Sequence, residues 1–307
     1  MIPHVVVVGS LNMDLVIQAP RHPAPGETIT GEAFRMIPGG KGANQAVAAA
    51  RMGGRVTMIG SVGPDPFGDE LVANLRAAGV ETQTVGRAAA PTGVALITVC
   101  SSGENTIVLA PGANGTLSPD IVAAHEPTIA TADVMLLQLE VPLGAVETAA
   151  RLAREHGVPV ILNPAPAQPL SSCILDSVSY LIPNEHEAAL LAELPANGDL
   201  DAGLAAARLR AQGLRNVVVT LGSRGALVST PDGLTSVPSF RVRSVDSTAA
   251  GDAFVGAFAV ALSEGRTVVE ATRWGCAAGA LACTVLGAQP SLPQRAAVEK
   301  LLHMEEP

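Results

Sequence analysis

Short apolar runs rich in Val, Ile and Leu alternate along most of the chain with longer, Ala-rich stretches of amphipathic pattern. The short runs have the length and composition of β-strands, and the amphipathic stretches have the period of α-helices. Strands that are apolar on both faces are typical of a parallel sheet covered by helices on both sides. We therefore predict an α/β fold with a doubly wound, mainly parallel sheet. The predicted strands are 4–8, 56–60, 134–139, 158–162, 180–182 and 217–221, and the predicted helices are 44–52, 67–78, 143–156, 185–193 and 201–212.

Two segments, 14–37 and 93–109, interrupt this alternation. Their apolar and polar residues roughly alternate without a helical period, and turn residues such as Pro25-Gly26 break them up. We expect antiparallel strands that form a small β-sheet beside the main sheet. Such a sheet could act as a lid that keeps water from a reacting phosphate, and its outer face could equally form a dimer contact. Because no repeat or linker marks a second domain, we treat residues 1–307 as a single domain with this lid.

Composition narrows the classes of protein that the chain can belong to. Apolar residues make up 48% of the 307 positions and charged residues 15%, which allows a sizeable core. A net charge of −9 and the lack of a Lys/Arg run argue against a nucleic-acid partner. No uncharged apolar stretch reaches the ~18 residues of a membrane helix, and the start of the chain lacks a signal-peptide pattern. We therefore expect no membrane contact and a cytoplasmic location.

The cysteines are Cys100, Cys173, Cys276 and Cys283, and they form neither a CxxC pair nor a metal-ligand spacing. Cys276 and Cys283 lie seven residues apart in a stretch of small residues, which places them on one face of a predicted helix. We expect both to be buried thiols that pack like small apolar side chains. Unpaired cysteines fit a reducing cytoplasm.

The junction between Asp246 and Asp252 carries the strongest chemical signal. It reads Asp-Ser-Thr-Ala-Ala-Gly-Asp and leads directly into an apolar stretch, 253–262. Small residues let the backbone approach a ligand closely, and the free N–H groups and positive dipole end of a helix favour an anion such as a phosphate. Asp252 at that helix start could accept a proton from a hydroxyl, as phosphoryl transfer to an alcohol requires. The alternative is that Asp252 only caps the helix after a Gly turn.

Polar residues of two further segments suit the hydroxyl groups of a sugar. Asn12 and Asp14 follow the first predicted strand and lie on one face of an extended chain. The motif 39–44 reads Gly-Gly-Lys-Gly-Ala-Asn before a predicted helix, and it matches neither a P-loop nor a dinucleotide fingerprint. Lys41 and Asn44 could donate to hydroxyl or phosphate oxygens. Both segments could instead be ordinary polar loops.

Other polar residues follow predicted strands at the edge where ligands bind in doubly wound sheets. Glu140 follows one such strand. Asn184 and Glu187 begin a helix, either as a capping box or as a polar pair that holds water around Mg²⁺ on nucleotide phosphates. The segment 220–225 reads Thr-Leu-Gly-Ser-Arg-Gly and could bind nucleotide phosphates, with Arg224 exposed nearby, or form a simple turn. No Gly-x-Ser-x-Gly elbow is present in the sequence, which argues against a triad hydrolase.

Taken together and in this order, these motifs resemble the ribokinase group of PfkB-type carbohydrate kinases. The resemblance covers almost the whole chain, and 39–46 matches the first signature of that family. It implies a doubly wound α/β domain with a β-sheet lid, through which such kinases often form homodimers. The matching segments are 9–14, 25–28, 39–46, 163–167, 183–185, 220–225, 246–252 and 287–291.

The resemblance also implies an activity, the ATP-dependent phosphorylation of D-ribose at O5. Asp252 would be the base that deprotonates the 5-hydroxyl. The backbone N–H groups of Ala249, Ala250 and Gly251 would stabilise the charge that develops on the γ-phosphoryl group. The residues that the resemblance assigns to the sugar are Asn12, Asp14, Gly39, Gly40, Lys41, Asn44, Glu140 and Asp252.

Mg²⁺ bound with ATP and K⁺ as a monovalent activator are further implications of the resemblance, with Glu187 linked to Mg²⁺ through water. The positions assigned to K⁺ are Asp246, Thr248, Ala282, Val285, Gly287 and Ser291. The positions assigned to ATP are Asn184, Thr220, Gly222, Ser223, Arg224, Gly225, Gly251 and Cys276. Two positions depart from the family pattern. Cys276 stands where a His commonly lies against the adenine, and Ala249-Ala250 replaces a common Gly-Ala pair.

Alternatives to ribose phosphorylation stay open at this point. The fold could serve a kinase of deoxyribose, fructose or a nucleoside, although Phe34 is the only aromatic residue of the lid segments that could stack on a base. A non-catalytic sugar or nucleotide sensor built on a kinase scaffold is another alternative. The presence of Asp252 favours catalysis over a sensor.

Overall fold

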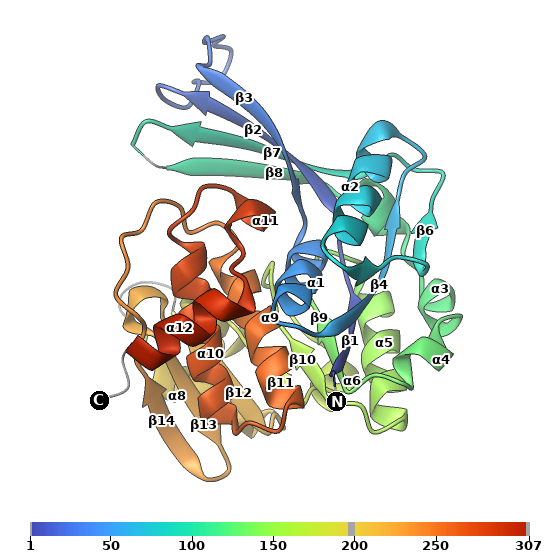
Figure 1. Ribbon diagram of the computed structural model, residues 1–307, viewed down its shortest axis with the longest axis vertical. Helices are drawn as coiled ribbons and strands as arrows, with labels where there is room; N and C mark the ends of the chain where they lie inside the picture. Colours follow the sequence, from blue (N-terminus) through green and yellow to red (C-terminus); the bar gives the residue numbers. More distant parts are fainter. Residues whose placement is uncertain (1, 103, 196–199, 305–307) are drawn as a thin grey trace.

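The computed structural model describes residues 2–102, 104–195 and 200–304, and its main feature is one large sheet (Figure 1). The strands of this sheet are β1 (His4–Val8), β4 (Arg55–Val62), β5 (Val80–Glu81), β6 (Val85–Arg87), β9 (Val134–Leu137), β10 (Val160–Leu162), β11 (Tyr180–Leu181), β12 (Asn216–Thr220), β13 (Ala226–Thr230) and β14 (Gly233–Val237). Their order is β14-β13-β12-β11-β10-β9-β1-β4-β5, and β6 pairs with β4. The pairs β12–β13 and β13–β14 are antiparallel, and the other pairs are parallel.

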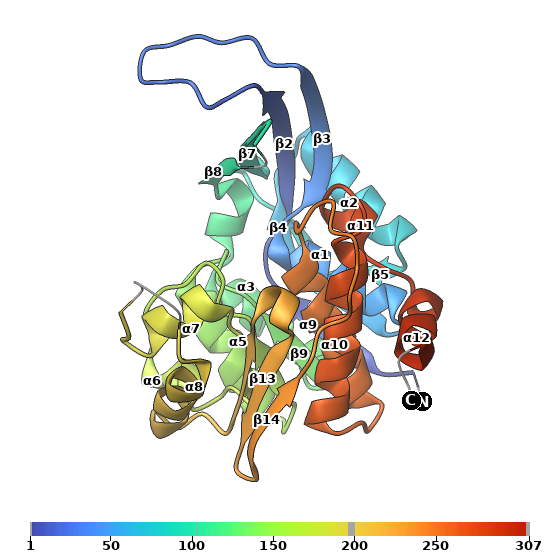
Figure 2. The same ribbon diagram turned by 90° about the vertical axis from the view of Figure 1, so that its left-hand side faces the viewer.

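Helices cover both faces of this sheet. They are α1 (Lys41–Arg51), α2 (Pro66–Ala77), α3 (Pro119–Ala123), α4 (Glu126–Ile129), α5 (Leu143–Glu155), α6 (Ser172–Leu175), α7 (Glu185–Leu191), α8 (Ala202–Ala211), α9 (Ala250–Ser263), α10 (Val268–Ala282), α11 (Ala288–Ser291) and α12 (Arg295–Met304), with 3₁₀ turns η1 (Gly112–Thr116) and η2 (Gly222–Arg224). Figure 2 shows α9, α10 and α12 on one side of the sheet and α5 to α8 on the other. Accordingly, Val5 and Val7 of β1 pack into a core with Phe258, whereas Val6 and Val8 pack into a second core with Leu152. The predicted doubly wound fold is confirmed.

A small sheet projects from one end of the molecule and forms the lid (Figure 1). Its strands are β2 (Asn12–Ala19), β3 (Ala33–Gly39), β7 (Gly93–Cys100) and β8 (Asn105–Ala110), in the order β3-β2-β7-β8. The outer pairs β2–β3 and β7–β8 are antiparallel as expected, but the central pair β2–β7 is parallel. Both central strands leave the main sheet at the same edge, because β2 follows β1 and β7 follows β6, and β1 and β6 are each parallel to β4. Residue 103 of the predicted lid lies outside the described residues.

Most element boundaries agree with the sequence to within three residues, and β1 agrees at both ends. α1 begins at Lys41, three residues before its predicted start. The glycine next to Lys41 packs directly on the backbone that follows β1, since a Cβ added to Gly42 would lie 2.5 Å from the Ser10 nitrogen. Glycine there serves close approach rather than a loop, which is why the helix extends further. Among the described helices, none is long and apolar enough to span a membrane.

The cysteines are free thiols in different surroundings. Cys100 and Cys276 are buried, whereas Cys173 is exposed. The prediction that Cys283 is buried beside Cys276 is wrong, because Cys283 is the C-cap residue of α10 and is partly exposed. Because α10 ends at Ala282, Cys283 lies outside the helix and is not packed in the core beside Cys276.

Candidate active site

The predicted sugar and phosphate residues meet at the carboxyl edge of the main sheet, where the lid begins. Glu140 follows β9, Asn12 begins β2, Lys41 begins α1, and Asp252 lies in the first turn of α9. In doubly wound sheets this edge is the usual place for a ligand. The structure therefore brings together four segments that the sequence only suggested were neighbours.

Glu140 joins three of these segments through one carboxylate oxygen. Its Oε2 accepts a hydrogen bond from the backbone nitrogen of Lys41 at 3.0 Å and from Asn12 Nδ2 at 3.4 Å. The hydroxyl of Ser10 donates to the same oxygen. A carboxylate at the start of α1 is also favoured by the positive end of the helix dipole. Glu140 consequently holds the β1–β2 loop and the start of α1 in one arrangement.

Asn114, which the sequence did not single out, fixes the side chain of Asn12. Asn114 Nδ2 donates to Asn12 Oδ1 at 2.7 Å. The same amide also brackets the backbone of Leu11, with its Oδ1 accepting from the Leu11 nitrogen at 2.9 Å and its Nδ2 donating to the Leu11 carbonyl at 3.0 Å. Asn114 is 1% exposed, so water does not replace these contacts. The orientation of the Asn12 amide, with Nδ2 towards Glu140, follows from this contact.

Asp14 lies against the glycine motif. A Cβ added to Gly39 would lie 2.3 Å from Asp14 Oδ2, so only glycine leaves room for this carboxylate. Burial, together with the charges of Glu140 and Asp252, raises the pKa of Asp14 to about 7 against the opposing effect of Lys41. Near neutral pH the carboxyl group is thus present in both protonation states, and it can donate to or accept from a hydroxyl.

Lys41 is the positive centre of the site. Burial by itself would lower the pKa of its ammonium group, but nearby carboxylates raise that pKa above the ordinary value, Asp252 first and then Glu140, Glu187 and Asp14. Lys41 therefore stays charged at neutral pH. The ammonium group offsets one of the negative charges around it. The pocket therefore keeps a net negative charge, which a bound cation would reduce.

Asp252 is a buried carboxylate with two amide donors. Asn44 Nδ2 donates to its Oδ2 at 2.9 Å, and Gln45 Nε2 donates to its Oδ1 at 3.1 Å. Burial raises the pKa of Asp252, while Lys41 and the two amides act against this rise. The result is a carboxylate with a stronger affinity for protons than an exposed one, which suits a general base. Gln45 was not among the predicted site residues, because the glycine motif that marked the site in the sequence ends at its neighbour Asn44.

Asp252 is not the cap of its helix, so the alternative interpretation of this junction is wrong. The N-cap residue of α9 is Ala249, and no side chain caps the helix there. Ala249 adopts the left-handed conformation with φ 58° and ψ 11°. This conformation costs an alanine about 1–2 kcal/mol relative to the right-handed one. The left-handed residue turns the chain so that α9 begins at Ala250, whose nitrogen donates to the Ser247 carbonyl at 3.2 Å. Gly251 follows in the first turn, where backbone N–H groups have no partner within the helix.

The predicted K⁺ residues lie on two loops that hydrogen bonds hold together. Asp246 Oδ1 accepts from the Thr248 nitrogen at 2.9 Å and from the Thr248 hydroxyl at 2.6 Å, and its Oδ2 accepts from the Gly287 nitrogen at 2.8 Å. Burial would raise the pKa of Asp246, but these hydrogen bonds outweigh it and lower the pKa below its usual value. On the second loop the Val285 nitrogen donates to the carbonyl of Ala282, the last residue of α10, and in α11, which follows this loop, the Ser291 hydroxyl donates to the Ala288 carbonyl.

The predicted nucleotide residues lie at the ends of β11 and β12. Asn184 and Glu187 form a complete capping box at the start of α7, and burial raises the pKa of Glu187. A parallel β-bridge between Asn184 and Thr220 aligns this helix start with the turn that follows β12. Arg224 in that turn forms an ion pair with Glu185. The remaining predicted nucleotide residues of this turn are Gly222, Ser223 and Gly225.

Cys276, the predicted adenine contact, packs in the core beside α9. Its side chain is 5% exposed, and burial raises the pKa of the thiol to about 12. A neutral, buried thiol offers a base little surface and no charge. An adenine ring near this position would therefore contact neighbouring residues more than the sulfur.

A cavity of about 350 Å³ opens between the lid and the two loops of the predicted K⁺ residues. Asp14, Arg35 and Ile37 line it from the lid, and Asp246 and Thr248 line it from the main domain. The cavity thus connects the sugar side of the site with the turn before α9. Ligand binding here would involve both the lid and the main domain.

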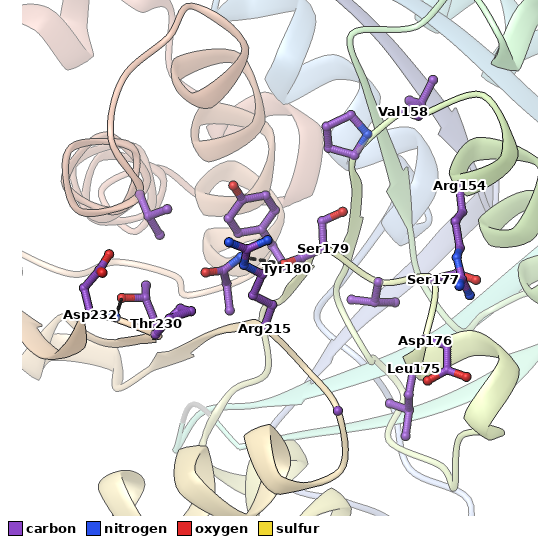
Figure 3. A pocket seen from close by; sticks show the side chains of 17 residues that line it. Arg154, Val158, Leu175, Asp176, Ser177, Ser179, Tyr180, Arg215, Thr230 and Asp232 are labelled. Atoms are coloured by element: carbon purple, nitrogen blue, oxygen red, sulfur yellow. Dashed lines mark hydrogen bonds between the residues drawn. The ribbon is translucent and has the colours of Figure 1, made fainter.

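A second cavity, of about 640 Å³, lies at the opposite edge of the sheet (Figure 3). It is lined by residues at the amino ends of β10, β11 and β12, including Tyr180 and Arg215, and by residues just after α5, α6 and α8. Helix carboxyl ends carry the negative end of the dipole and disfavour a phosphate. This larger cavity is consequently not the site for phosphoryl transfer, and the smaller one beneath the lid is the candidate.

Comparison with known proteins agrees with this fold. Residues 3–295 match the pfkB family of carbohydrate kinases, and the chain belongs to this family. Among its relatives, the ribokinase of Haemophilus influenzae is 43% identical over 290 residues, which cover 94% of this chain and 95% of that protein. The deoxyribokinase of Salmonella typhimurium is 36% identical and covers 98% of this chain and 99% of its own. The structure of Arabidopsis thaliana ribokinase complexed with ribose and ATP has a TM-score of 0.91 at 35% identity, and covers 98% of this chain and 99% of that chain.

Proposed function

We propose that this chain is a kinase that transfers the γ-phosphoryl group of ATP to O5 of D-ribose, giving D-ribose 5-phosphate and ADP. The observation that carries this proposal is the buried carboxylate of Asp252, held by two amides in the first turn of α9 and next to the charged side chain of Lys41. Relatives named ribokinase at 41–43% identity support ribose as the acceptor.

The residues of the site have distinct roles in the proposed reaction. Asp252 takes the proton of the 5-hydroxyl, O5 forms a bond to the γ-phosphorus, and the bond to the bridging oxygen of ADP breaks. Backbone N–H groups of Ala249, Ala250 and Gly251 stabilise the charge on the transferred group. The residues proposed to bind the sugar are Asn12, Asp14, Gly39, Gly40, Lys41, Asn44 and Glu140.

An unpaired oxygen in the site supports sugar binding. Asn44 Oδ1 is buried and has no hydrogen-bond partner among the described residues, while Asn44 Nδ2 is held by Asp252. A buried acceptor without a partner costs about 1–3 kcal/mol. A ligand hydroxyl would satisfy this oxygen, and ribose supplies several.

The proposed nucleotide site lies beside the sugar site and uses Mg²⁺ that arrives with ATP. No group of three or more acidic, His or Cys side chains in the described chain could hold a metal by itself, which fits an ion carried by the triphosphate. Both oxygens of Glu187 accept from Asn184, and Glu187 would act on this ion through water. When bound, Mg²⁺ neutralises phosphate charge. The residues proposed to contact ATP are Asn184, Thr220, Gly222, Ser223, Arg224, Gly225, Gly251 and Cys276.

K⁺ is the proposed monovalent activator. The two loops between Asp246 and Ser291 supply a carboxylate, hydroxyls and several carbonyl oxygens next to the turn before α9, a donor set that fits a hard monovalent cation better than a transition metal. A bound cation adds positive charge near the transferred phosphate. Replacing K⁺ by tetramethylammonium at constant ionic strength should lower kcat, and an unchanged kcat would contradict this part of the proposal. The residues proposed for the ion are Asp246, Thr248, Ala282, Val285, Gly287 and Ser291.

A homodimer through the lid is the proposed assembly. Large apolar side chains are exposed on the lid, including Phe34 at 60%, Leu96 at 54% and Val108 at 64%. Exposed apolar groups gathered on one small sheet favour association. Sedimentation velocity should give a dimer that Leu96→Glu converts to a monomer.

The proposed location is the cytoplasm, because an ATP-consuming enzyme with free thiols suits a reducing compartment.

Deoxyribose is the second candidate acceptor, because one relative at 36% identity is named deoxyribokinase. The two sugars differ by one hydroxyl, so a comparison of kcat/KM for ribose and deoxyribose decides between them. A nucleoside is disfavoured, since Phe34 faces solvent rather than the cavity.

The proposal is tested by ADP release from purified protein with MgATP, K⁺ and D-ribose. Folded protein that releases no ADP with any pentose would point to the sensor alternative. Asp252→Asn should lower kcat by about 10²–10⁴-fold while ribose binding, measured by calorimetry, stays within a few-fold. Turnover that survives this substitution would show that another group is the base.

A further inference from the structure

Gln45 lies at the centre of a network of amide groups behind Asp252. Its Nε2 donates to Asp252 Oδ1 at 3.1 Å and to Asn163 Oδ1 at 3.2 Å, and its Oε1 accepts from Gln138 Nε2 at 2.6 Å. Asn163 Nδ2 donates to the backbone carbonyl of Ile182 at 2.9 Å. Gln45 and Gln138 are both 0% exposed. The four groups come from α1, the residue after β9, the residue after β10 and the residue after β11.

These contacts leave the Gln45 amide a single orientation. Both hydrogens of Nε2 have acceptors and Oε1 has a donor. If the Gln45 amide were reversed, its oxygen would face the oxygens of Asp252 and Asn163, and its NH₂ group would face the NH₂ group of Gln138. Water does not reach this place, so these unfavourable contacts would not be relieved. The backbone carbonyl of Ile182 cannot reverse, so it fixes Asn163, and Asn163 fixes the orientation of Gln45. Gln138 then anchors the Gln45 side chain by donating to its Oε1.

We propose that Gln45 is a positioning residue that sets the plane of the Asp252 carboxylate, and that Gln138 acts on Asp252 only through Gln45. The proposal rests on the proposed function, in which Asp252 is the base. Asn44 and Gln45 are adjacent in α1 and donate to Oδ2 and Oδ1 respectively, so one helix turn holds both oxygens. The plane of the carboxylate decides which lone pair faces the attacking hydroxyl.

The charged groups around Asp252 do not replace this function. They are Lys41 from α1, Glu140 after β9, Asp14 from β2 and Glu187 from α7. Each acts on Asp252 through its charge, and no hydrogen bond between these side chains and Asp252 is present in the described part of the chain. Charge interactions depend on distance but hardly on the rotation of a carboxylate, whereas hydrogen bonds are directional. Orientation of the base therefore depends on the amides.

A double-mutant cycle tests the proposal. Gln45→Met keeps the size of the side chain and removes its donors, and should lower kcat roughly 10–100-fold, because misplacement of a catalytic group by about 1 Å costs about that much. Gln138→Met, which does not contact Asp252, should lower kcat several-fold. The double variant should have the kcat of Gln45→Met alone, because Gln138 has no other route to the base. The dissociation constant for ribose, measured by calorimetry, should stay within about twofold of the starting protein in all three.

Two further variants separate positioning from stability. Thr272→Val removes a hydrogen bond to the Val268 carbonyl in α10 at a residue that is not proposed to bind the sugar, ATP or an ion, and should lower Tm without changing kcat. Gln45→Glu keeps an acceptor for Gln138 and sets a second carboxylate against Asp252, so it should lower kcat at least as far as Gln45→Met. It keeps the test decisive if Gln45→Met does not fold.

Multiplicative losses of kcat in the double variant, an unchanged kcat in Gln138→Met, or ribose affinity that falls in step with kcat would each overturn the proposal. The proposed function fails separately, since it requires loss of turnover in Asp252→Asn. Inactive Asp252→Asn together with multiplicative losses at Gln45 and Gln138 would refute only the positioning role.

Discussion

The backbone nitrogen of Lys41 donates a 3.0 Å hydrogen bond to Glu140 Oε2, across 99 positions of sequence. The bond ties the first residue of α1 to the loop after β9. It also sets the backbone position from which the Lys41 side chain extends towards the carboxylates around it. The place of this positive charge in the pocket thus depends on a backbone contact that the local sequence does not predict.

Glu140→Gln should weaken ribose binding more than it slows the chemical step. An amide oxygen in the place of Oε2 can still accept from the Lys41 nitrogen, Asn12 and Ser10, but a neutral acceptor holds these donors more weakly, and the negative charge that favours the start of α1 is lost. We expect KM for ribose to rise about tenfold, which is about 1.4 kcal/mol. Steady-state kinetics give the result. Glu155→Gln, an exposed change on α5 at a residue paired with Arg151, is the control for the loss of charge.

Asn114→Ala should raise KM through Asn12, although Asn114 is not proposed to bind the sugar. The substitution removes the contacts that orient the Asn12 amide and leaves Leu11 backbone groups unpaired. We expect about 2–3 kcal/mol less stability and a KM for ribose roughly tenfold higher. Asn216→Ala removes an amide that donates to the Ser179 carbonyl at the other edge of the sheet, and serves as matched control. Equal effects of the two variants on KM would contradict the assignment.

Ala249→Gly should stabilise the protein. Glycine adopts the left-handed conformation of this position without strain, and the relief exceeds the entropy that glycine adds to the unfolded chain, for a net gain of about 0.5–1 kcal/mol. Ala250→Gly, one residue further and inside α9, should instead destabilise by a similar amount. Chemical denaturation of both variants gives the comparison. A loss of stability in Ala249→Gly would show that the position is not strained.

Asp14→Asn should change how stability depends on pH. The pKa of Asp14 is about 7 in the folded state, against an unfolded value near 3.8, so the folded state binds the extra proton between these two values. Stability from this group is therefore greatest below the unfolded pKa and falls as pH rises towards 7. Asparagine removes the effect, and the stability of Asp14→Asn relative to the original protein should increase by about 2 kcal/mol between pH 5 and pH 8. Urea denaturation at both pH values measures it, and a difference that does not vary with pH would refute the buried, repelled carboxylate.

The local part of the site was predictable from the sequence. Asn12, Asp14, Lys41, Asn44 and Asp252 lie in short motifs at strand ends, and strand ends can be located because apolar runs stop there. Parallel strands then bring these motifs to one edge. The assignment of Asp252 to a helix cap was the alternative that structure removed, since the left-handed Ala249 takes the cap position.

The amide residues were not predictable. Gln45, Gln138 and Asn163 are ordinary polar side chains in sequence, and their hydrogen bonds join positions 93 and 118 residues apart. Asn114 likewise meets Asn12 across 102 positions. An amide has no preferred local partner, so its role depends on which groups the fold sets beside it.

By itself, the sequence determined the order of strands and helices, the two lid segments and the chemical types at the sheet edge, because apolar period and turn residues act over a few positions. Tertiary structure decided the parallel pairing of β2 and β7, the burial of Cys276 without Cys283, and the hydrogen bonds that orient Asn12 and Asp252. The physical reason is that burial and long-range hydrogen bonds are properties of the packed chain. They come into being only when distant segments exclude water together.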